Sequence, residues 1–325
     1  MKKKVLLVGN FGSRNVGDEI ILWTALQKYP EAVVMTADEN FSQRFLQISL
    51  PDKEAREGIK NSELTNLPTF IPPFPTGLRS FLKFIFRKKS REIYKKLEIE
   101  KIIFPGGGLL AIKLRAYFIW GLIVWWLRKY FPKAEIIFEH QGVDKINCPV
   151  KKAVIKYVSN NLSKISVRDK ISRDFLQSLH IKSVEDKDRV EKFLNSAEFK
   201  SFDTTTKSRK NLVLINACRE NPAKFSDLCT PKNLPQGTSA VFVCFDPNDA
   251  KYVPQGFKGK IIFPENVEET FKLFQKARMA IGQRLHFLIL ANHFCGFEKT
   301  FVLGEPYSQK VKNFAEKYGI KVKPF

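Results

Sequence analysis

Two polar residues, Arg284 and His286, open a strongly apolar segment, Gly282-Gln-Arg-Leu-His-Phe-Leu-Ile-Leu-Ala291. The pattern predicts a helix that begins directly after a strand and places its apolar side chains in the core. Packing does not explain two polar residues at its start. A guanidinium can bind a carboxylate or phosphate through paired hydrogen bonds, and an imidazole can transfer protons near neutral pH. We therefore predict that Arg284 binds an anionic substrate and that His286 takes part in proton transfer.

A glycine-rich segment, Gly9–Glu19, follows the first predicted strand and leads into a predicted helix. Its glycines let the backbone approach a ligand closely, and the start of a helix offers N–H groups to an anion. The spacing matches neither the dinucleotide-binding fingerprint nor a Walker loop. Gly12 and Asn15 are candidate substrate-binding residues, and Asp18 is a candidate catalytic carboxylate. The alternative is that Asp18 and Glu19 only stabilise the start of the helix.

A second loop, Phe104–Leu110, also follows a strand and contains three successive glycines: Gly106, Gly107 and Gly108. Three glycines in a row lose much backbone entropy on folding, so a plain turn is a poor explanation for them. Close approach of the loop backbone to a ligand or to the facing loop explains them better. We predict that all three line the substrate site.

Two further cations follow predicted strands. Arg168 ends the strand in Ile165–Asp169, and Lys310 opens a predicted helix after the turn at Gly304. Either side chain could bind a phosphate or carboxylate at the carboxyl end of a sheet. The alternatives are a local salt bridge or helix cap for the Arg168–Asp169 pair, and an ordinary surface position for Lys310.

Two parallel sheets are predicted to position these residues, because short apolar runs alternate with amphipathic stretches along the whole chain. The first domain is predicted over residues 1–188 and the second over 205–325, with a polar boundary at 186–210. The fold class is α/β, with two doubly wound domains that place a ligand at the carboxyl ends of their strands. The predicted strands are 5–9, 32–36, 101–104, 135–139, 164–167, 212–216, 240–245, 260–263, 279–281 and 300–303.

The charge is strongly positive, with 55 Lys and Arg against 33 Asp and Glu and a net charge of +22. This charge indicates an anionic partner. No nucleic-acid-binding motif accompanies it, and we expect that nucleic acid does not bind. The five cysteines show no metal-ligand spacing. They predict buried reduced thiols, a cytoplasmic protein and no metal requirement.

Two apolar segments in the first half could meet a membrane. The twelve uncharged residues 116–127 are too few for a membrane-spanning helix, which needs about 20, and we predict that they pack in the core. Residues 78–101, within a basic and aromatic insertion at 67–101, mix aromatic and aliphatic side chains with Lys and Arg. Such a segment suits the surface of an anionic membrane or a core helix followed by a solvated basic face, and both interpretations stay open.

Taken in order, the motifs resemble the polysaccharide pyruvyl transferase family. The resemblance rests on Gly-Asn-x-Gly…Asn-x-Gly-Asp-Glu, Gly-Gly-Gly-Leu, Ser-Val-Arg-Asp, Arg-Leu-His and Tyr-x-x-Lys-Val, which span Gly9 to Val311. It implies two facing Rossmann-like domains of the GT-B type with a cleft between them. It also implies transfer of a pyruvyl group from phosphoenolpyruvate, with no cofactor, to a sugar of a cell-envelope or extracellular polysaccharide as a ketal.

The resemblance assigns roles to the candidate residues. Arg168, Arg284 and Lys310 would bind the two anionic groups of phosphoenolpyruvate. His286 and Asp18 would transfer protons, and Arg168 is counted with them as catalytic. Gln141 would join the substrate site. Two departures concern the acceptor: Ser308 stands where the family commonly has Asp, and Asp144 follows Gln141-Gly-Val143 in place of Gly-Pro. A glycan acceptor on a lipid carrier would explain a peripheral location at the inner face of the membrane.

Two other functions remain open on the sequence. One is a GT-B glycosyltransferase that uses a nucleotide-sugar donor. The other is a protein without catalytic activity that binds a membrane surface or nucleic acid on the same scaffold. Binding of phosphoenolpyruvate against nucleotide sugars separates the first from pyruvyl transfer, and replacement of His286 separates the second.

Overall fold

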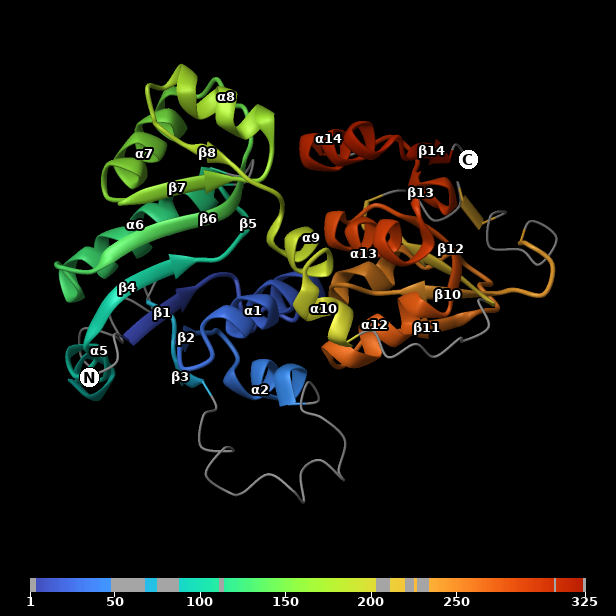
Figure 1. The fold of residues 1–325 in the computed structure, drawn as a ribbon, viewed down its shortest axis with the longest axis horizontal. Coiled ribbons are helices and arrows are strands. Elements are labelled where there is room, and N and C mark those ends of the chain that lie inside the picture. The colour runs from blue at the N-terminus through green and yellow to red at the C-terminus, as the bar shows by residue number, and fades with distance from the viewer. Residues whose placement is uncertain are drawn as a thin grey trace. The chain divides into compact units, whose positions relative to one another are not determined.

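The computed structural model describes residues 4–47, 68–74, 88–110, 114–202, 211–219, 225–226, 234–306 and 308–323. The chain forms two compact units, each built on its own parallel sheet (Figure 1). Unit 1 comprises Met1–Ser13, Ile21–Ser42 and Asp52–Arg189, and unit 2 comprises Arg14–Ile20, Gln43–Pro51 and Val190–Phe325. The predicted α/β fold with two Rossmann-like sheets is confirmed.

The sheet of unit 1 is parallel throughout, in the order β3-β2-β1-β4-β6-β7-β8, with β5 paired to β6. Its central strands are apolar on both faces, as expected where helices cover both sides of a sheet. Leu6 and Leu7 of β1 and Ile102 and Ile103 of β4 are fully buried. The strands are β1 (Lys4–Val8), β2 (Val33–Met35), β3 (Thr69–Ile71), β4 (Ile99–Phe104), β5 (Gly107–Leu110), β6 (Glu135–Val143), β7 (Lys164–Val167) and β8 (Val184–Glu185).

The helices that connect these strands are α1 (Val16–Lys28), α2 (Glu39–Gln47), α5 (Lys88–Lys95), α6 (Leu114–Tyr130), α7 (Pro149–Asn160) and α8 (Lys170–Ser178). One continuous apolar core contains side chains from α5, α6, α7 and α8 together with strand residues. The first turn of α1 belongs to unit 2, while the rest of that helix belongs to unit 1.

Helix α6 contains the apolar segment 116–127, and most of it packs in the core as predicted. Tyr117, Trp120 and Val124 are buried, whereas Phe118 and Trp125 are exposed on one side. Within the described ranges, none of the helices combines the length and apolar character that crossing a membrane requires. Residues 78–87 of the basic segment lie outside the described residues.

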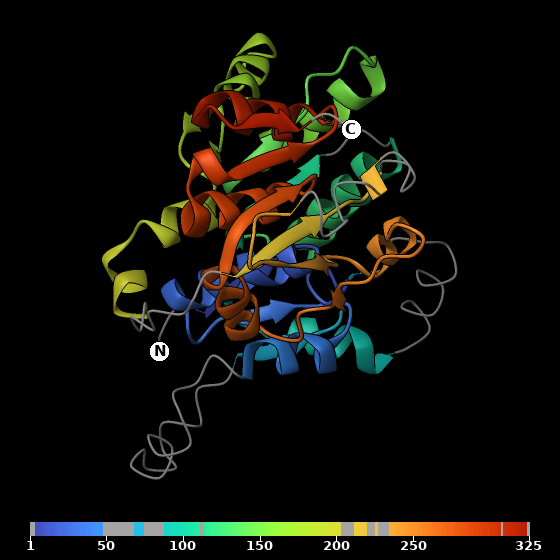
Figure 2. The ribbon, with the colours of Figure 1, turned by 90° about the vertical axis from the view of Figure 1, so that its right-hand side faces the viewer.

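Unit 2 repeats the architecture with the strand order β11-β10-β9-β12-β13-β14, again all parallel. In Figure 2 these strands, drawn in yellow to red, lie side by side. The strands are β9 (Leu212–Asn216), β10 (Ser239–Val243), β11 (Lys260–Ile262), β12 (Ala277–Gly282), β13 (Thr300–Leu303) and β14 (Lys321–Lys323). The α-helices are α9 (Arg189–Leu194), α10 (Ala197–Phe202), α12 (Val267–Gln275), α13 (Leu285–Cys295) and α14 (Gln309–Tyr318), and 3₁₀ helices occupy Pro247–Tyr252 and Phe297–Lys299.

The polar stretch 186–210, expected as a boundary, contains the short helices α9 and α10. Val190, Phe193 and Phe199 are buried on them, and the Phe199 ring contacts the rings of Phe271 and His293. A few apolar residues among many charged ones therefore suffice to pack α9 and α10 in unit 2.

The strand order reverses direction between β9 and β12, because connections on either side of this pair run outward to opposite edges. In doubly wound sheets, the carboxyl ends of such neighbouring strands flank the crevice where ligands bind. In unit 2 this position is occupied by the residues after Asn216 and Gly282, which include Arg284.

Candidate active site

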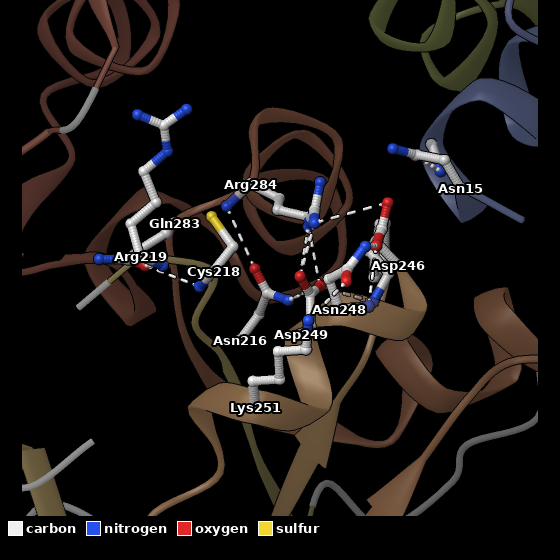
Figure 3. A network of polar contacts seen from close by, with 12 residues as sticks. Asn15, Asn216, Cys218, Arg219, Asp246, Asn248, Asp249, Lys251, Gln283 and Arg284 are labelled. Carbon is white, nitrogen blue, oxygen red and sulfur yellow. Dashed lines mark hydrogen bonds and ion pairs between the residues drawn. The ribbon is translucent and has the colours of Figure 1, made fainter. Parts of the chain in front are cut away.

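Arg284 lies at the start of α13 and is held by a buried carboxylate, Asp249. The guanidinium donates to Asp249 through Nε, at 3.0 and 2.8 Å, and through Nη2, at 2.5 Å. Asp246 lies 3.8 Å from Nη2 (Figure 3). Burial alone would lower the pKa of Arg284, but hydrogen bonds and charge attraction from Asp249 outweigh it and raise the pKa. Arg284 is therefore a permanent cation in a fixed orientation.

Two amides fix the ends of the strands beside Arg284. Asn216 donates to Asp249 at 3.1 Å and accepts from the backbone N–H of Arg284 at 3.1 Å. Gln283 is fully buried and accepts from the backbone N–H groups of Cys218 and Arg219, at 2.8 and 3.1 Å. The sequence analysis missed Asn216, Asp249 and Gln283. The sequence indicated them only weakly: Asn216 ends a predicted strand, and Asp249 and Gln283 lie a few residues after predicted strands.

The first turn of α1 packs against His286. Val16 donates its backbone N–H to the carbonyl of Phe245 at 2.8 Å, which fixes this turn beside the end of β10. A Cβ atom built on Gly17 would lie only 2.3 Å from Nδ1 of His286. Glycine at position 17 therefore permits an approach to the imidazole that any other residue would block. Residues 14–19 of the glycine-rich segment and the Arg-Leu-His motif, far apart in sequence, come together in unit 2.

Asn15 and Asp18 lie in the same turn. The side chain of Asn15 accepts from the backbone N–H groups of Gly17 and Asp18, at 3.0 and 3.3 Å, and so caps α1. Figure 3 shows Asn15 facing the network around Arg284 and Asp246. Asp18 is half-buried in the first turn of the helix. Lys310, also in unit 2, is half-buried in the first turn of α14, while the motif residue Tyr307 lies outside the described residues.

The remaining candidates belong to unit 1. Gly12 has a φ of 72°, and a Cβ there would lie 2.3 Å from the backbone nitrogen of Asp38. Gly106 and Gly107 have φ of 140° and 101°, conformations that side-chain-bearing residues rarely adopt. Gly108 continues the loop into β5. The backbone conformation at Gly106 and Gly107 thus favours glycine irrespective of any ligand.

Arg168 and Gln141 lie at neighbouring strand ends in unit 1. The guanidinium of Arg168 is buried, bonds Asp188 at 3.3 Å and covers Gly142, where a Cβ would lie 2.2 Å from Nη2. Gln141 donates to the carbonyl of Phe104 at 2.9 Å, and its buried Oε1 accepts from no described residue. The Arg168–Asp188 ion pair was not anticipated. Asp169, for which the sequence left a salt bridge or a helix cap open, lies 3.8 Å from Arg168 and caps α8 by accepting from the backbone N–H of Ser172.

His140 is the feature of this cluster that sequence reasoning missed. It is buried within β6 with a φ of 55°, and its Nδ1 lies 2.7 Å from the carbonyl of Lys187. Burial and the nearby guanidinium of Arg189 hold the pKa of His140 below its ordinary value. Arg189 in turn donates to the carbonyl of Pro105 at 2.6 Å and pairs with Glu139. Residues 187–189 therefore connect the ends of β4 and β6.

The left-handed backbone of His140 gives a measurable prediction. A non-glycine residue in this conformation is strained by about 1–2 kcal/mol. We expect His140→Gly to unfold at higher urea concentration than His140→Ala, by about 1 kcal/mol in the free energy of unfolding, although both lose the bond to Lys187. Equal stability of the two variants in urea titrations would show that the backbone there carries no strain.

A family model for polysaccharide pyruvyl transferases matches residues 15–294. The chain belongs to the polysaccharide pyruvyl transferase family. The match covers both units, including Asn15, Arg168 and the Arg284–His286 motif. It confirms the family suggested by the ordered motifs and assigns the chain to a family of transferases that act on polysaccharides.

Solved structures resemble this pyruvyl transferase family member in fold. UDP-GlcNAc 2-epimerase from Methanocaldococcus jannaschii is 12% identical with a TM-score of 0.57, covering 99% of this chain and 88% of the other. A putative UDP-N-acetylglucosamine 2-epimerase from Listeria monocytogenes is 12% identical with a TM-score of 0.58, and the match covers 99% of this chain and 84% of the other. The enzyme from Neisseria meningitidis is 13% identical with a TM-score of 0.54, covering 96% and 85%. A comparison with curated protein sequences gave no significant match.

The thiol of Cys244 makes the stability of this family member depend on pH. Cys244 is a free, buried thiol after β10, and burial together with Asp249 raises its pKa to about 12. An unfolded chain releases this proton near the ordinary pKa of 9.0, whereas the folded chain keeps it. Stability conferred by the protonated thiol is therefore lost as the pH rises from about 9 towards 12. Cys244→Ala should reduce the loss of unfolding free energy, measured in urea, as the pH rises from about 9 towards 12. Replacement of the half-buried Cys148 by Ala is the control. Equal pH dependence in Cys244→Ala and the parent protein would contradict this prediction.

Among the described residues, no group of three or more His, Cys, Asp or Glu side chains is arranged to hold a metal ion.

Proposed function

We propose that the protein transfers the pyruvyl group of phosphoenolpyruvate to two hydroxyls of one sugar in a cell-envelope or extracellular polysaccharide. Family membership supports a transferase that acts on polysaccharides. The observation that carries the choice of donor is the approach of Gly17 to His286 next to Arg284. It combines a proton-transferring side chain, a fixed cation and a helix start, which together suit an anionic enol substrate.

The reaction places definite demands on these groups. C3 of the enol gains a proton, C2 forms bonds to two sugar oxygens, and the bond from C2 to the phosphate oxygen breaks. One hydroxyl proton goes to C3 and the other leaves with inorganic phosphate. His286 is the group proposed to move the first proton. The carboxylate of Asp18 is proposed to accept the proton of the acceptor hydroxyl.

Cations are proposed to hold the carboxylate and phosphate of the donor. Asp249 occupies Nε and Nη2 of Arg284, but Nη1 is bonded to no described residue and the side chain is 22% exposed. Nη1 can therefore face a ligand. The other residues proposed to contact substrate are Arg168, Lys310, Gly12, Asn15, Gly106, Gly107, Gly108 and Gln141.

Thermal unfolding with different donors tests the proposal. A ligand that binds only the folded protein raises its stability, by about 2.7 kcal/mol at one hundred times its dissociation constant. We expect phosphoenolpyruvate to raise the melting temperature and nucleotide sugars to leave it unchanged. His286→Gln should retain this shift while losing transfer, and Arg284→Met should reduce it. Arg278→Met, a cation on β12 that bonds the carbonyl of Gln236, is the control.

The opposite result selects the rival function. A shift with a nucleotide sugar alone would replace pyruvyl transfer by glycosyl transfer on the same scaffold. No shift with any donor would reject both and leave a non-catalytic role.

We also propose that the protein works at the inner face of the cytoplasmic membrane, where glycans are carried on lipids. The basic segment 78–101 suggested this location, and its described part, α5, carries four cations and one Glu. Anionic lipid headgroups attract such clusters.

A further inference from the structure

Helix α6 exposes an apolar stripe on the surface of unit 1. Phe118 is 53% exposed and Trp125 41% exposed, with the half-buried Leu122 between them. Their spacing, followed by Lys129, places all four on one face of the helix. The ammonium of Lys129 lies 5.1 Å from the centre of the Trp125 ring. An aromatic stripe in contact with a cation is thus open to solvent.

Helix α7 extends this stripe. Gly121 lets the two helices approach closely, because a Cβ there would lie 3.3 Å from Val154 of α7. The two helices lie side by side behind β6 and β7 in Figure 1. On α7, Val150 is 48% exposed and Tyr157 41% exposed. We define the α6–α7 face by Phe118, Leu122, Trp125 and Lys129 of α6 and by three exposed residues of α7, Val150, Lys156 and Tyr157.

The charge of these helices has one sign. Residues 114–130 and 149–160 contain six Lys and Arg and neither Asp nor Glu. Helix α5 contacts the C-terminal end of α6, since the ring of Tyr94 lies 5.4 Å from that of Tyr130, and its Lys95 is exposed. A surface partner must therefore be anionic and must also accept aromatic rings.

We infer that the α6–α7 face docks on an anionic lipid bilayer. Exposed Trp, Phe and Tyr rings prefer the boundary between headgroups and acyl chains, and Lys stems cover apolar surface while their ammonium groups reach the phosphates. Four exposed apolar side chains give only reversible binding, so the cations make it depend on anionic lipid. This inference extends the membrane location proposed above, but its test uses neither donor nor acceptor, so it can fail while pyruvyl transfer stands.

Vesicle flotation tests the docking surface. The full-length protein should float with vesicles of phosphatidylcholine mixed with phosphatidylglycerol, should not float with phosphatidylcholine alone, and should dissociate as salt is raised. The double variant Phe118→Ser, Trp125→Ser should lose binding about tenfold or more. Phe297→Ser is the matched control, because Phe297 is also 53% exposed but lies on unit 2.

The cations are tested separately. Lys129→Gln with Lys156→Gln should weaken binding to the anionic vesicles, whereas Lys312→Gln on α14 should not. Circular dichroism spectra that match the parent protein show that each variant is folded.

Three outcomes would overturn the inference. They are absence of flotation with anionic vesicles, an equal loss in the Phe297→Ser control, and a dimer that the double variant converts to a monomer without any vesicle binding. The last result would identify the α6–α7 face as an interface with a second copy of the chain.

Discussion

Replacing Gly17 by alanine should reduce pyruvyl transfer about 100-fold or more, because misplacing a catalytic group by about 1 Å has an effect of this size. The new Cβ would lie 2.3 Å from Nδ1 of His286, so the imidazole or the first turn of α1 must move. The substitution itself suits a helix, where alanine is more favourable than glycine by about 0.5–1 kcal/mol. This gain offsets part of the cost of that movement, so the variant should stay folded while the rate of transfer falls.

Gly121→Ala is the control for this variant. Its Cβ would lie 3.3 Å from Val154, in the α6–α7 contact and not in the candidate site. It should leave transfer unchanged even if it costs some stability. A Gly17→Ala protein that retains the full rate of transfer would remove His286 from the mechanism in the place proposed here.

Replacing Asp249 by alanine should have the largest effect on stability among the site residues. Asp249 is fully buried and accepts hydrogen bonds from Arg284, Asn216 and the backbone of Phe245. Removing one partner of a buried ion pair typically costs about 3–5 kcal/mol, since it leaves the other charge without compensation. We expect about 3 kcal/mol in urea unfolding, because the side chain of Arg284 is 22% exposed.

Asp246→Ala is the matched comparison. Asp246 lies 3.8 Å from Arg284, is 21% exposed, and caps the 3₁₀ helix through the backbone N–H of Asn248. Losing such a cap costs about 1 kcal/mol. If the two variants unfold at the same urea concentration, the bidentate bond to Asp249 does not anchor Arg284.

The strands were the most predictable part of the fold. The predicted ranges 164–167, 212–216 and 300–303 coincide with β7, β9 and β13. Each is a short apolar run bounded by polar residues, which is how a strand covered on both faces reads in a sequence. The edge strand β8, Val184–Glu185, was not predicted, because its two residues are exposed and show no apolar pattern.

Helix α6 shows where periodicity alone falls short. Its uncharged run predicts burial, yet Phe118 and Trp125 are exposed, because the helix has more apolar residues than its core-facing side can bury. Which side faces the sheet is decided by neighbours such as Gly121 and Val154, which are far apart in sequence.

Motif reasoning singled out candidate groups for the site but not the residues that hold them. Arg284 and His286 were identified from one segment, since their polarity conflicts with the apolar helix that follows. Asp249 and Asn216 lie 35 and 68 positions from Arg284, and only the topology of the sheet makes them neighbours. His140 could not be recognised either, because its left-handed backbone leaves no trace in the residue type.

Pyruvyl transfer is tested most directly by following the donor carbon itself. Phosphoenolpyruvate labelled with ¹³C at C2 would be incubated with the protein and a panel of cell-envelope glycans, and the glycans examined by NMR. We predict that the label appears as a ketal carbon bonded to two sugar oxygens, that phosphate is released in equal amount, and that His286→Gln abolishes both. Transfer of a sugar from a nucleotide donor, with no label in any glycan, would contradict pyruvyl transfer.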